Sequence, residues 1–277
     1  MTEKYDLHSH SNISDGVLSP TDLVRRAHEH GVTSLALTDH DTTAGLAEAK
    51  AASEATGIRL ISGIELSASW QNKTLHIIGL GIDPQYPPLL NAIRDLQVIR
   101  FERAEKIAAK LEKKRIPGAL AAVMTSAGNS MITRTHFADF LVSQFHVSNQ
   151  QEAFDRYLAK GKPAYVATVW ADMALAVDWI TQSGGVAVLA HPLRYKLTPN
   201  VMKRLLPAFK DAGGQGIEVI TGRCNADEIK LAAYYANIYD LAGSVGSDFH
   251  SPVNPWVELG RLQPLPEHIK PVWELFG

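Results

Sequence analysis

Short, continuously apolar segments recur along the chain, and stretches with helical periodicity separate most of them. These segments are 5-YDLHSH, 34-SLALTDH, 58-IRLISGIEL, 75-LHIIGLGI, 186-VAVLAHP, 216-GIEVI and 242-AGSVGSDFH. Their lengths and β-branched residues are typical of strands that are covered on both faces. Between the first two, Ser19 and Pro20 indicate the start of a helix and Gly31 its end. Repetition of strand, helix and strand predicts parallel strands with crossover helices, and hence an α/β barrel or a doubly wound sheet.

The pattern changes between about residues 84 and 165. Residues 88–115 carry apolar side chains at helical spacing, and helix-like sequence follows over 134–144 and 150–160. We therefore predict a helical insertion over residues 84–165 that packs as a cap on the rest of the chain. The barrel would then consist of residues 1–83 and 166–277, a length sufficient for one large core.

Composition and charge exclude several classes of protein. A formal net charge of -2 provides no broad basic surface for long nucleic acid or for an anionic membrane. The single cysteine, Cys224, excludes an intramolecular disulfide and a cysteine-based zinc site. The N-terminus lacks the pattern of a signal peptide, and no apolar run reaches the roughly 18 residues of a membrane span. We therefore expect a cytoplasmic location and a small or short substrate.

Histidines and carboxylates gather at the ends of the apolar runs. His8 and His10 alternate along the first run, so both side chains face one side, and Asp15 follows five residues later. The other members of this set are His40, Glu65, His76, His191, Asp248 and His250. A lone histidine at a strand end is usually structural, and we assign His28, His30, His146 and His268 to that class. Nine such groups at one rim are different, because α/β folds build their active sites where parallel strands end.

A metal centre explains this accumulation of ionisable groups. Burying many imidazoles and carboxylates together is costly unless a cation compensates for their lost hydration. Nitrogen and oxygen ligands without thiolate suit Mn²⁺, Fe²⁺ or Zn²⁺. Nine ligands are too many for one ion and suit two or three. An acid among histidines can bridge two ions, and we assign that role to Glu65.

With all of these motifs in order from residue 5 to about 252, the chain resembles the PHP (polymerase and histidinol phosphatase) family. The resemblance implies a distorted, TIM-like (β/α)7 barrel that holds two or three divalent ions, with Mn²⁺ as the first choice, at its C-terminal rim. It implies catalytic roles for His191, Glu65 and Asp248. It also implies three ligand groups: His8, His10, Glu65 and Asp248; Glu65, His76 and His191; and Asp15, His40 and His250.

The insertion narrows the resemblance to one subgroup of the family. With 133-TRTHF-137 and 191-HPLRY-195, the chain is similar to nucleoside 3',5'-bisphosphate phosphatases, also described as 5'-to-3' exoribonucleases acting on short RNA. That likeness implies that Arg134, His136 and Arg194 face the substrate phosphate, and Arg223 is a weaker candidate. The implied reaction is attack of metal-activated water on a nucleotide phosphate monoester. His136, and His191 if it is not fully committed to metal, are candidates for the acid that protonates the leaving group.

Other interpretations remain open at this point. Histidinol phosphate is an alternative substrate, and an amidohydrolase-type enzyme shares the HxH motif. Asp39, Asp41 and Thr43 match the DxDxT of haloacid-dehalogenase phosphatases, but that mechanism would leave the histidines without a role. We expect Asp39 and Asp41 instead to cap the strand end or to hydrogen-bond ligand histidines. A degenerate PHP domain that stabilises a partner without catalysis is the alternative from another class.

Overall fold

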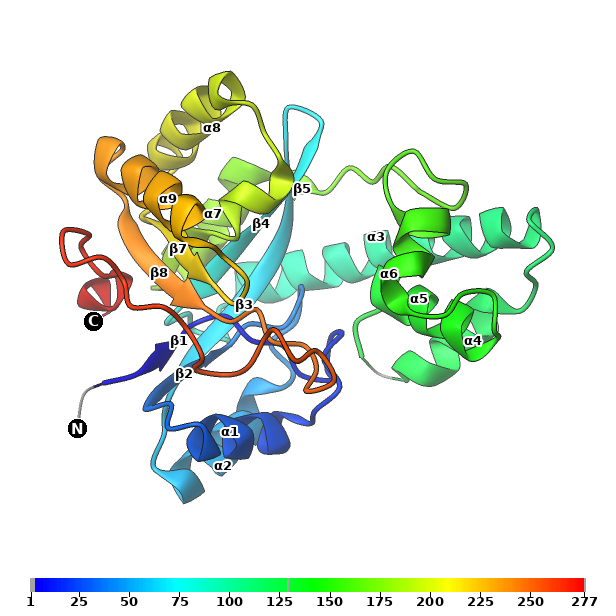
Figure 1. Cartoon of the computed structure of the whole chain (residues 1–277), viewed down its shortest axis with the longest axis horizontal. Coiled ribbons are helices and arrows are strands. Elements are labelled where there is room, and N and C mark those ends of the chain that lie inside the picture. Colours follow the sequence, from blue (N-terminus) through cyan, green and yellow to red (C-terminus); the bar gives the residue numbers. More distant parts are fainter. Residues whose placement is uncertain (1–2, 129, 277) are drawn as a thin grey trace.

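A nearly closed barrel of seven strands forms the main body of the computed structural model, which describes residues 3–128 and 130–276 (Figure 1). The strands neighbour one another in the order β1, β2, β3, β4, β6, β7, β8, and β5 pairs with β3. A parallel bridge between Ser9 and Phe249 brings the first strand beside the last. The α/β barrel predicted from the sequence is therefore confirmed.

The strands are β1 (Tyr5–Asp6), β2 (Ser34–Leu37), β3 (Arg59–Trp70), β4 (Lys73–Leu80), β5 (Ala171–Asp172), β6 (Val186–Leu189), β7 (Gly216–Thr221) and β8 (Ala242–Gly246). The helices are α1 (Pro20–Glu29), α2 (Leu46–Thr56), α3 (Pro87–Glu112), α4 (Ala119–Ala127), α5 (Arg134–Ser143), α6 (Gln150–Ala153), α7 (Met173–Gln182), α8 (Pro199–Asp211) and α9 (Ala226–Ile238). None of the helices in the described part of the chain is both long enough and apolar enough to cross a membrane.

One strand runs against the direction that the sequence predicted. β4 is antiparallel to both β3 and β6, whereas the other barrel pairings are parallel. Only Gln71 and Asn72 separate β3 from β4, and both have positive φ angles, 44° and 61°. Two residues suffice for a tight hairpin but not for a crossover helix. The N-terminal part of β4 therefore reaches the rim where the parallel strands end, and it brings His76 there.

Helix α3 joins the barrel to the cap (Figure 1). Leu89, Ile93 and Leu96, in its first half, belong to the main apolar cluster of the barrel. Ile107 and Leu111, in its second half, belong to a separate cluster with α4, α5 and α6. Helices occupy the three predicted places in the insertion, and α4 is an additional one. The separate cluster supports the proposal that residues 84–165 form a cap of their own.

A buried ion pair ties α3 to the rim of the barrel. Arg100 is only 5% exposed, and its Nε donates to Asp41 Oδ2 at 2.7 Å. Its Nη2 donates to Ser67 Oγ at 2.9 Å, and Asp41 Oδ1 accepts from the Ser67 amide at 2.7 Å. Because Asp41 follows His40 at the end of β2, this network connects the cap directly to the candidate site.

Arg100→Leu should lower the free energy of unfolding by about 3–5 kcal/mol, because it leaves the Asp41 carboxylate buried without its partner. Urea denaturation measures this change. Arg94→Leu, at an exposed position on the same helix, is the matched control and should change stability by about 0.5 kcal/mol or less. Equal losses in the two variants would show that the ion pair contributes little.

Candidate metal centre

Glu65 lies at the centre of the rim and is fully buried. Its Oε2 is 3.4 Å from the Nε2 atoms of both His8 and His10. Its Oε1 is 2.9 Å from His76 Nδ1 and 3.1 Å from His191 Nε2. The two carboxylate oxygens therefore face different sets of histidines, which is the arrangement that a bridging carboxylate requires.

Asp248 completes the first of the predicted ligand groups. Its Oδ1 is 3.4 Å from His8 Nε2 and 3.2 Å from His10 Nε2. Those two imidazole nitrogens are 3.1 Å apart, and Glu65 approaches both of them. Ligand atoms of His8, His10 and Glu65 thus lie within 4.8 Å of one another, and Asp248 approaches both imidazoles. These side chains come from the segment after β1, from β3 and from the segment after β8.

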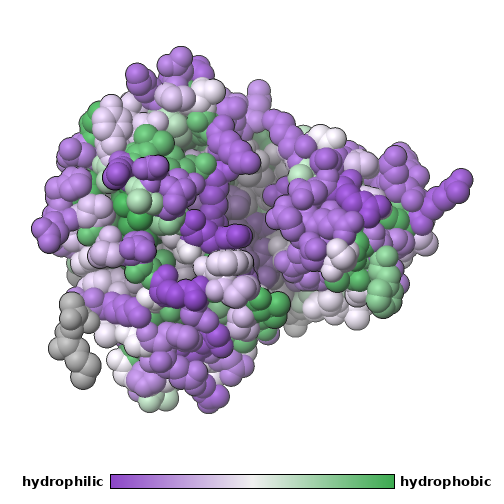
Figure 2. Space-filling view, viewed as in Figure 1, coloured by the Kyte–Doolittle hydropathy of each residue, from purple (hydrophilic) through white to green (hydrophobic). Residues whose placement is uncertain are grey.

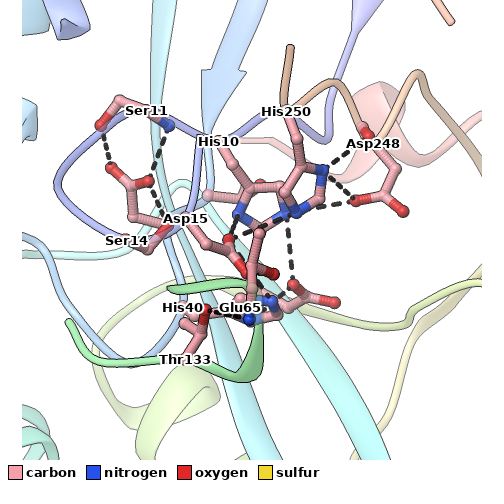
Figure 3. Close-up of polar contacts among 12 residues, drawn as sticks. His10, Ser11, Ser14, Asp15, His40, Glu65, Thr133, Asp248 and His250 are labelled. Carbon is pink, nitrogen blue, oxygen red and sulfur yellow. Dashed lines mark hydrogen bonds and ion pairs between the residues drawn. The ribbon is translucent and has the colours of Figure 1, made fainter. Parts of the chain in front are cut away.

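Asp15 organises a second convergence, toward the cap. Its Oδ1 is 3.3 Å from His250 Nε2, 3.9 Å from His40 Nε2 and 4.0 Å from His10 Nδ1. Figure 3 shows these side chains pointing toward one another and toward Glu65. His10 and His40 each present one ring nitrogen to Asp15 and the other to Glu65. The imidazoles of His10 and His40 thus lie between the carboxylates of Asp15 and Glu65. The structure brings all nine predicted ligand side chains together.

Several buried atoms in this cluster have no hydrogen-bond partner among the described residues. They are His10 Nδ1, Asp15 Oδ1, His40 Nδ1, Glu65 Oε2 and His191 Nδ1. Such atoms in a native site need an explanation, and a bound ion is one of the few available. Three sets of side chains in the cluster have ligand atoms within 4.8 Å of one another: His10, Asp15, His40 and His250; His8, His10 and Glu65; and His40, Glu65 and His76. The donor set of imidazoles and carboxylates fits divalent cations.

The charges of the cluster favour ionised carboxylates. Burial opposes ionisation, yet His40, His76 and His8 hold the pKa of Glu65 well below its usual value. Likewise, Arg194 and His8 outweigh burial and keep the pKa of Asp248 low. The carboxylates are thus available as ligands. The histidines must be neutral to bind a metal, so metal binding will release protons.

The backbone at the rim is strained at three positions. Asp41, His191 and Asp248 have φ angles of 50°, 28° and 55°, in the left-handed region that non-glycine residues rarely adopt. Strain of this kind persists where the surrounding structure enforces it, and it clusters at functional sites. His191 and Asp248 are both among the nine predicted ligands.

Glu218, on β7, contacts two of the ligand residues, and it was not among the residues predicted from the sequence. It is almost fully buried, and its Oε1 is 2.9 Å from His8 Nδ1. Its Oε2 accepts from the backbone amide of His191 at 2.5 Å. A single acid within the apolar run 216-GIEVI was the available signal. Carboxylates in this position orient a ligand imidazole and raise its basicity.

Glu218→Gln should weaken the affinity for Mn²⁺ about 10- to 100-fold, because the amide keeps the shape of the side chain but not its charge. A competition titration with a fluorescent chelator measures the change. Glu267→Gln, at an exposed position, is the matched control. Unchanged affinity in the Glu218 variant would remove the proposed orienting role.

Hydrogen bonds to ligand histidines, one of the two roles expected for Asp39 and Asp41, are not found among the described residues. Asp39 accepts from the Ser11 amide at 2.8 Å and from the hydroxyls of Ser11 and Ser14, each at 2.6 Å. It thereby holds the loop that carries Asp15. Asp41 pairs with Arg100 instead. Their closeness to His40 in sequence does not set their direction, because neighbouring side chains at a strand end point different ways.

A cavity of about 410 Å³ lies between the rim and the cap, and Figure 2 shows the surface hollowed between the barrel and the cap. Arg134, the first residue of α5, lines this cavity together with the rim residues Asp15 and His40. Arg194 also lines it and contacts the carboxylate of Asp248. Thr135 Oγ1 donates to Asp15 Oδ2 at 3.0 Å, a link between cap and rim that the sequence analysis did not identify.

The other two predicted substrate residues lie elsewhere. His136 does not line this cavity; its Nδ1 accepts from the Thr133 amide at 3.2 Å and completes a capping box at the start of α5. Arg223 lines a separate cavity of about 180 Å³, which it shares with His191, Arg194 and Cys224. Their roles in substrate binding stay predictions.

Comparison with known proteins agrees with this geometry. A profile of the PHP domain matches residues 6–221. The 5'-3' exoribonuclease of Haemophilus influenzae is 45% identical over 276 residues, which cover 100% of both chains. The 3',5'-nucleoside bisphosphate phosphatase of Chromobacterium violaceum is 44% identical over 97% of this chain and 94% of its own length. A solved structure described as an amidohydrolase from Chromobacterium violaceum, with bound sulfate and no metal, superposes with a TM-score of 0.93 at 44% identity and covers 98% of this chain and 95% of that one. On this evidence the chain belongs to the PHP domain family.

Proposed function

We propose that this chain is a metal-dependent phosphoesterase that hydrolyses a phosphate monoester of a nucleotide. The preferred substrate is the 3'-phosphate of nucleoside 3',5'-bisphosphates, and short 5'-phosphorylated RNA is a further one. The observation that carries this proposal is the convergence of Glu65 and eight further ligand side chains, beside a cavity lined by Arg134 and Arg194. Relatives with these two activities in their names, at 44% and 45% identity, support it.

The centre would hold two or three divalent ions, with Mn²⁺ ahead of Fe²⁺ and Zn²⁺. Glu65 would bridge two of them, and His10 and His40 would lie between neighbouring ions. Bound there, such ions lower the pKa of a coordinated water toward neutrality and offset charge on the phosphate oxygens. All-nitrogen and oxygen ligation suits each of these metals.

Two arginines would bind the phosphate oxygens, and a general acid would protonate the leaving group. Arg194, beside Asp248, and Arg134, at the start of α5, present planar forks that each match two phosphate oxygens. Donors placed in this way stabilise the charge that develops on phosphorus oxygens in the transition state. His191 would supply the proton for the leaving group only with its imidazole unbound by metal. His136, whose Nδ1 accepts from the Thr133 amide, is the other candidate. The sulfate bound by the Chromobacterium violaceum relative is a tetrahedral anion of the same shape as phosphate.

Phosphate release tests this function directly. Manganese-loaded protein should release phosphate from adenosine 3',5'-bisphosphate, and chelation should abolish the release. Histidinol phosphate is assayed in parallel in the same way, and a short 5'-phosphorylated RNA is assayed for release of mononucleotides as well as of phosphate. Activity on histidinol phosphate alone would keep the metal centre and replace the substrate. Inactivity on all three substrates would favour a non-catalytic accessory module.

A further inference from the structure

A second cavity, of about 180 Å³, lies beside the metal centre. It is lined by His191, one of the nine ligand residues, and by Glu218, which contacts His8 and the backbone of His191. Most of its remaining wall comes from β7, from α9 and from the turn between them. Arg194 lines both this second cavity and the large one. The metal centre is therefore approached by two cavities that meet at Arg194.

Arg223 brings a positive charge to the edge of the second cavity. It stands in the turn between β7 and α9, and its side chain is exposed. It forms no ion pair with any other residue in the part of the chain that the structure describes. Glu228 lines the cavity as well, but its Oε2 accepts from the Asn225 amide at 2.9 Å and so completes the cap of α9. The charge of Arg223 is thus available to an anionic ligand.

An exposed tryptophan lies near the same turn. Trp256 follows the ligand His250 by six residues in the sequence, and its side chain is 70% exposed. The next residue, Val257, is buried against the turn, since a Cβ placed on Gly222 would lie 3.1 Å from Val257 Cγ1. Gly222 directly precedes Arg223. The segment that carries Trp256 therefore packs on the turn that carries Arg223, and this part of the rim has both an aromatic ring and a cation.

Cleavage of an oligonucleotide requires more room at the centre than hydrolysis of a bisphosphate. In both substrates the hydroxyl group of water joins the phosphorus, the bond from phosphorus to the 3'-oxygen breaks, and the remaining proton of water passes to that oxygen. In-line attack leaves three other oxygens around the phosphorus. All three are free in the bisphosphate, whereas one of them carries the next nucleotide in an oligonucleotide. A centre that cleaves RNA therefore needs a second space for the nucleotide that follows the scissile bond.

We propose that the second cavity, with Arg223 and Trp256 at its edge, binds the nucleotide that follows the scissile phosphate of a short 5'-phosphorylated RNA. This inference rests on the proposed function. The cavity is smaller than the roughly 300–1,000 Å³ of pockets that enclose whole small-molecule ligands, so it holds the ribose beside the scissile phosphate. The base stacks on Trp256, and Arg223 contacts the next phosphate along the chain. This site distinguishes RNA from a free bisphosphate, which has no nucleotide to place there.

The test compares a substrate that fills the second cavity with one that does not. For metal-loaded protein, kcat/KM is measured on a 5'-phosphorylated RNA trinucleotide, by release of mononucleotide, and on adenosine 3',5'-bisphosphate, by release of phosphate. Trp256→Ala should lower the ratio of the first value to the second about 10-fold, mainly through a higher KM for the RNA, because a stacking platform for the base is lost. Arg223→Met should lower this ratio by a similar factor, because a contact with phosphate is lost.

Two controls match the residues that are changed. Phe145→Ala removes an aromatic ring of the cap that is 93% exposed, and Arg94→Met removes an exposed arginine of α3. Neither residue lines either cavity, so both variants should keep the wild-type ratio. Since Trp256 and Arg223 are themselves exposed, the variants at these positions should fold and should bind the same amount of metal as the wild type.

A 5'-phosphorylated dinucleotide separates the two contacts. It carries a second base but no phosphate after it. Trp256→Ala should therefore impair cleavage of the dinucleotide and the trinucleotide equally, whereas Arg223→Met should impair cleavage of the trinucleotide more. An Arg223→Met variant that loses equally on both lengths would contradict the contact that we assign to Arg223.

The possible failures are distinguishable. An unchanged ratio in both Trp256→Ala and Arg223→Met would overturn the proposed site. Equal losses on the RNA and the bisphosphate would also overturn it, because they would place these residues at the hydrolysed phosphate itself. Wild-type turnover of the bisphosphate without turnover of any RNA would overturn the site and leave the bisphosphate activity in place. Absence of turnover on every substrate would overturn the proposed function instead.

Discussion

Glu65→Ala should bind fewer metal ions than the wild-type protein and should lose phosphate release by at least about 10³-fold. Two oxygens of this carboxylate face different histidine groups, so its removal would take a ligand from both of the ions that we propose it bridges. Metal ions supply several kcal/mol of transition-state stabilisation, and each 1.36 kcal/mol lost costs about tenfold in rate. Elemental analysis and a phosphate-release assay on the same preparation measure both effects.

Glu267→Ala is the matched control for this experiment, because it removes an exposed glutamate outside the cluster. It should retain both its metal and its activity. A full metal complement in Glu65→Ala would refute the bridging role. Loss of activity with metal retained would instead assign Glu65 to another step.

Arg134→Met should lower kcat/KM on adenosine 3',5'-bisphosphate by about 10²-fold while metal content stays unchanged. Arg134 lines the cavity at the start of α5, and no ligand atom of the cluster belongs to it. Loss of one donor that stabilises transition-state charge typically costs 10²–10³ in rate. Steady-state kinetics and elemental analysis separate this outcome from loss of metal.

Arg134→Lys refines this second prediction, because lysine keeps the charge but not the planar fork. It should recover only part of the activity. If kcat/KM of Arg134→Met equals that of the wild type, the side chain has no contact with the reacting phosphate. Its stacking on Phe154, at 5.7 Å from the ring centroid, would then be its whole role.

The barrel was predictable because the apolar runs have the length and composition of buried strands. The direction of β4 was not, because Gln71 and Asn72 lack the Asn-Gly or Asp-Gly signal of a tight hairpin. Both ends of α1 were predictable from local signals. Ser19 caps its start and Pro20 is its first residue, whereas Gly31, just after its end, has a φ of 73°. The ends of a helix were thus predictable from its capping residues, whereas the direction of β4 depended on a turn that has weak sequence signals.

The convergence of the ligand side chains at the rim was also predictable, because the ends of parallel strands meet at one edge of a barrel. The partners of these residues were not predictable. Glu218 had only one signal, that of a lone acid within an apolar run, and Thr135 stands within a helical pattern that does not distinguish it. His136 was expected at the phosphate because of its motif, but the structure shows it capping α5. Motifs identify residue types, whereas the directions of side chains depend on tertiary packing.

The central claim is that the rim is a metal centre of two or three ions on which phosphoester hydrolysis depends. Titration of Mn²⁺ into metal-free protein, with bound metal and phosphate release from adenosine 3',5'-bisphosphate followed together, tests it most directly. We predict no release without metal, binding of two or three ions per chain, and activity that rises as they bind. Full activity of the metal-free protein, or saturation at one ion or none, would contradict the claim.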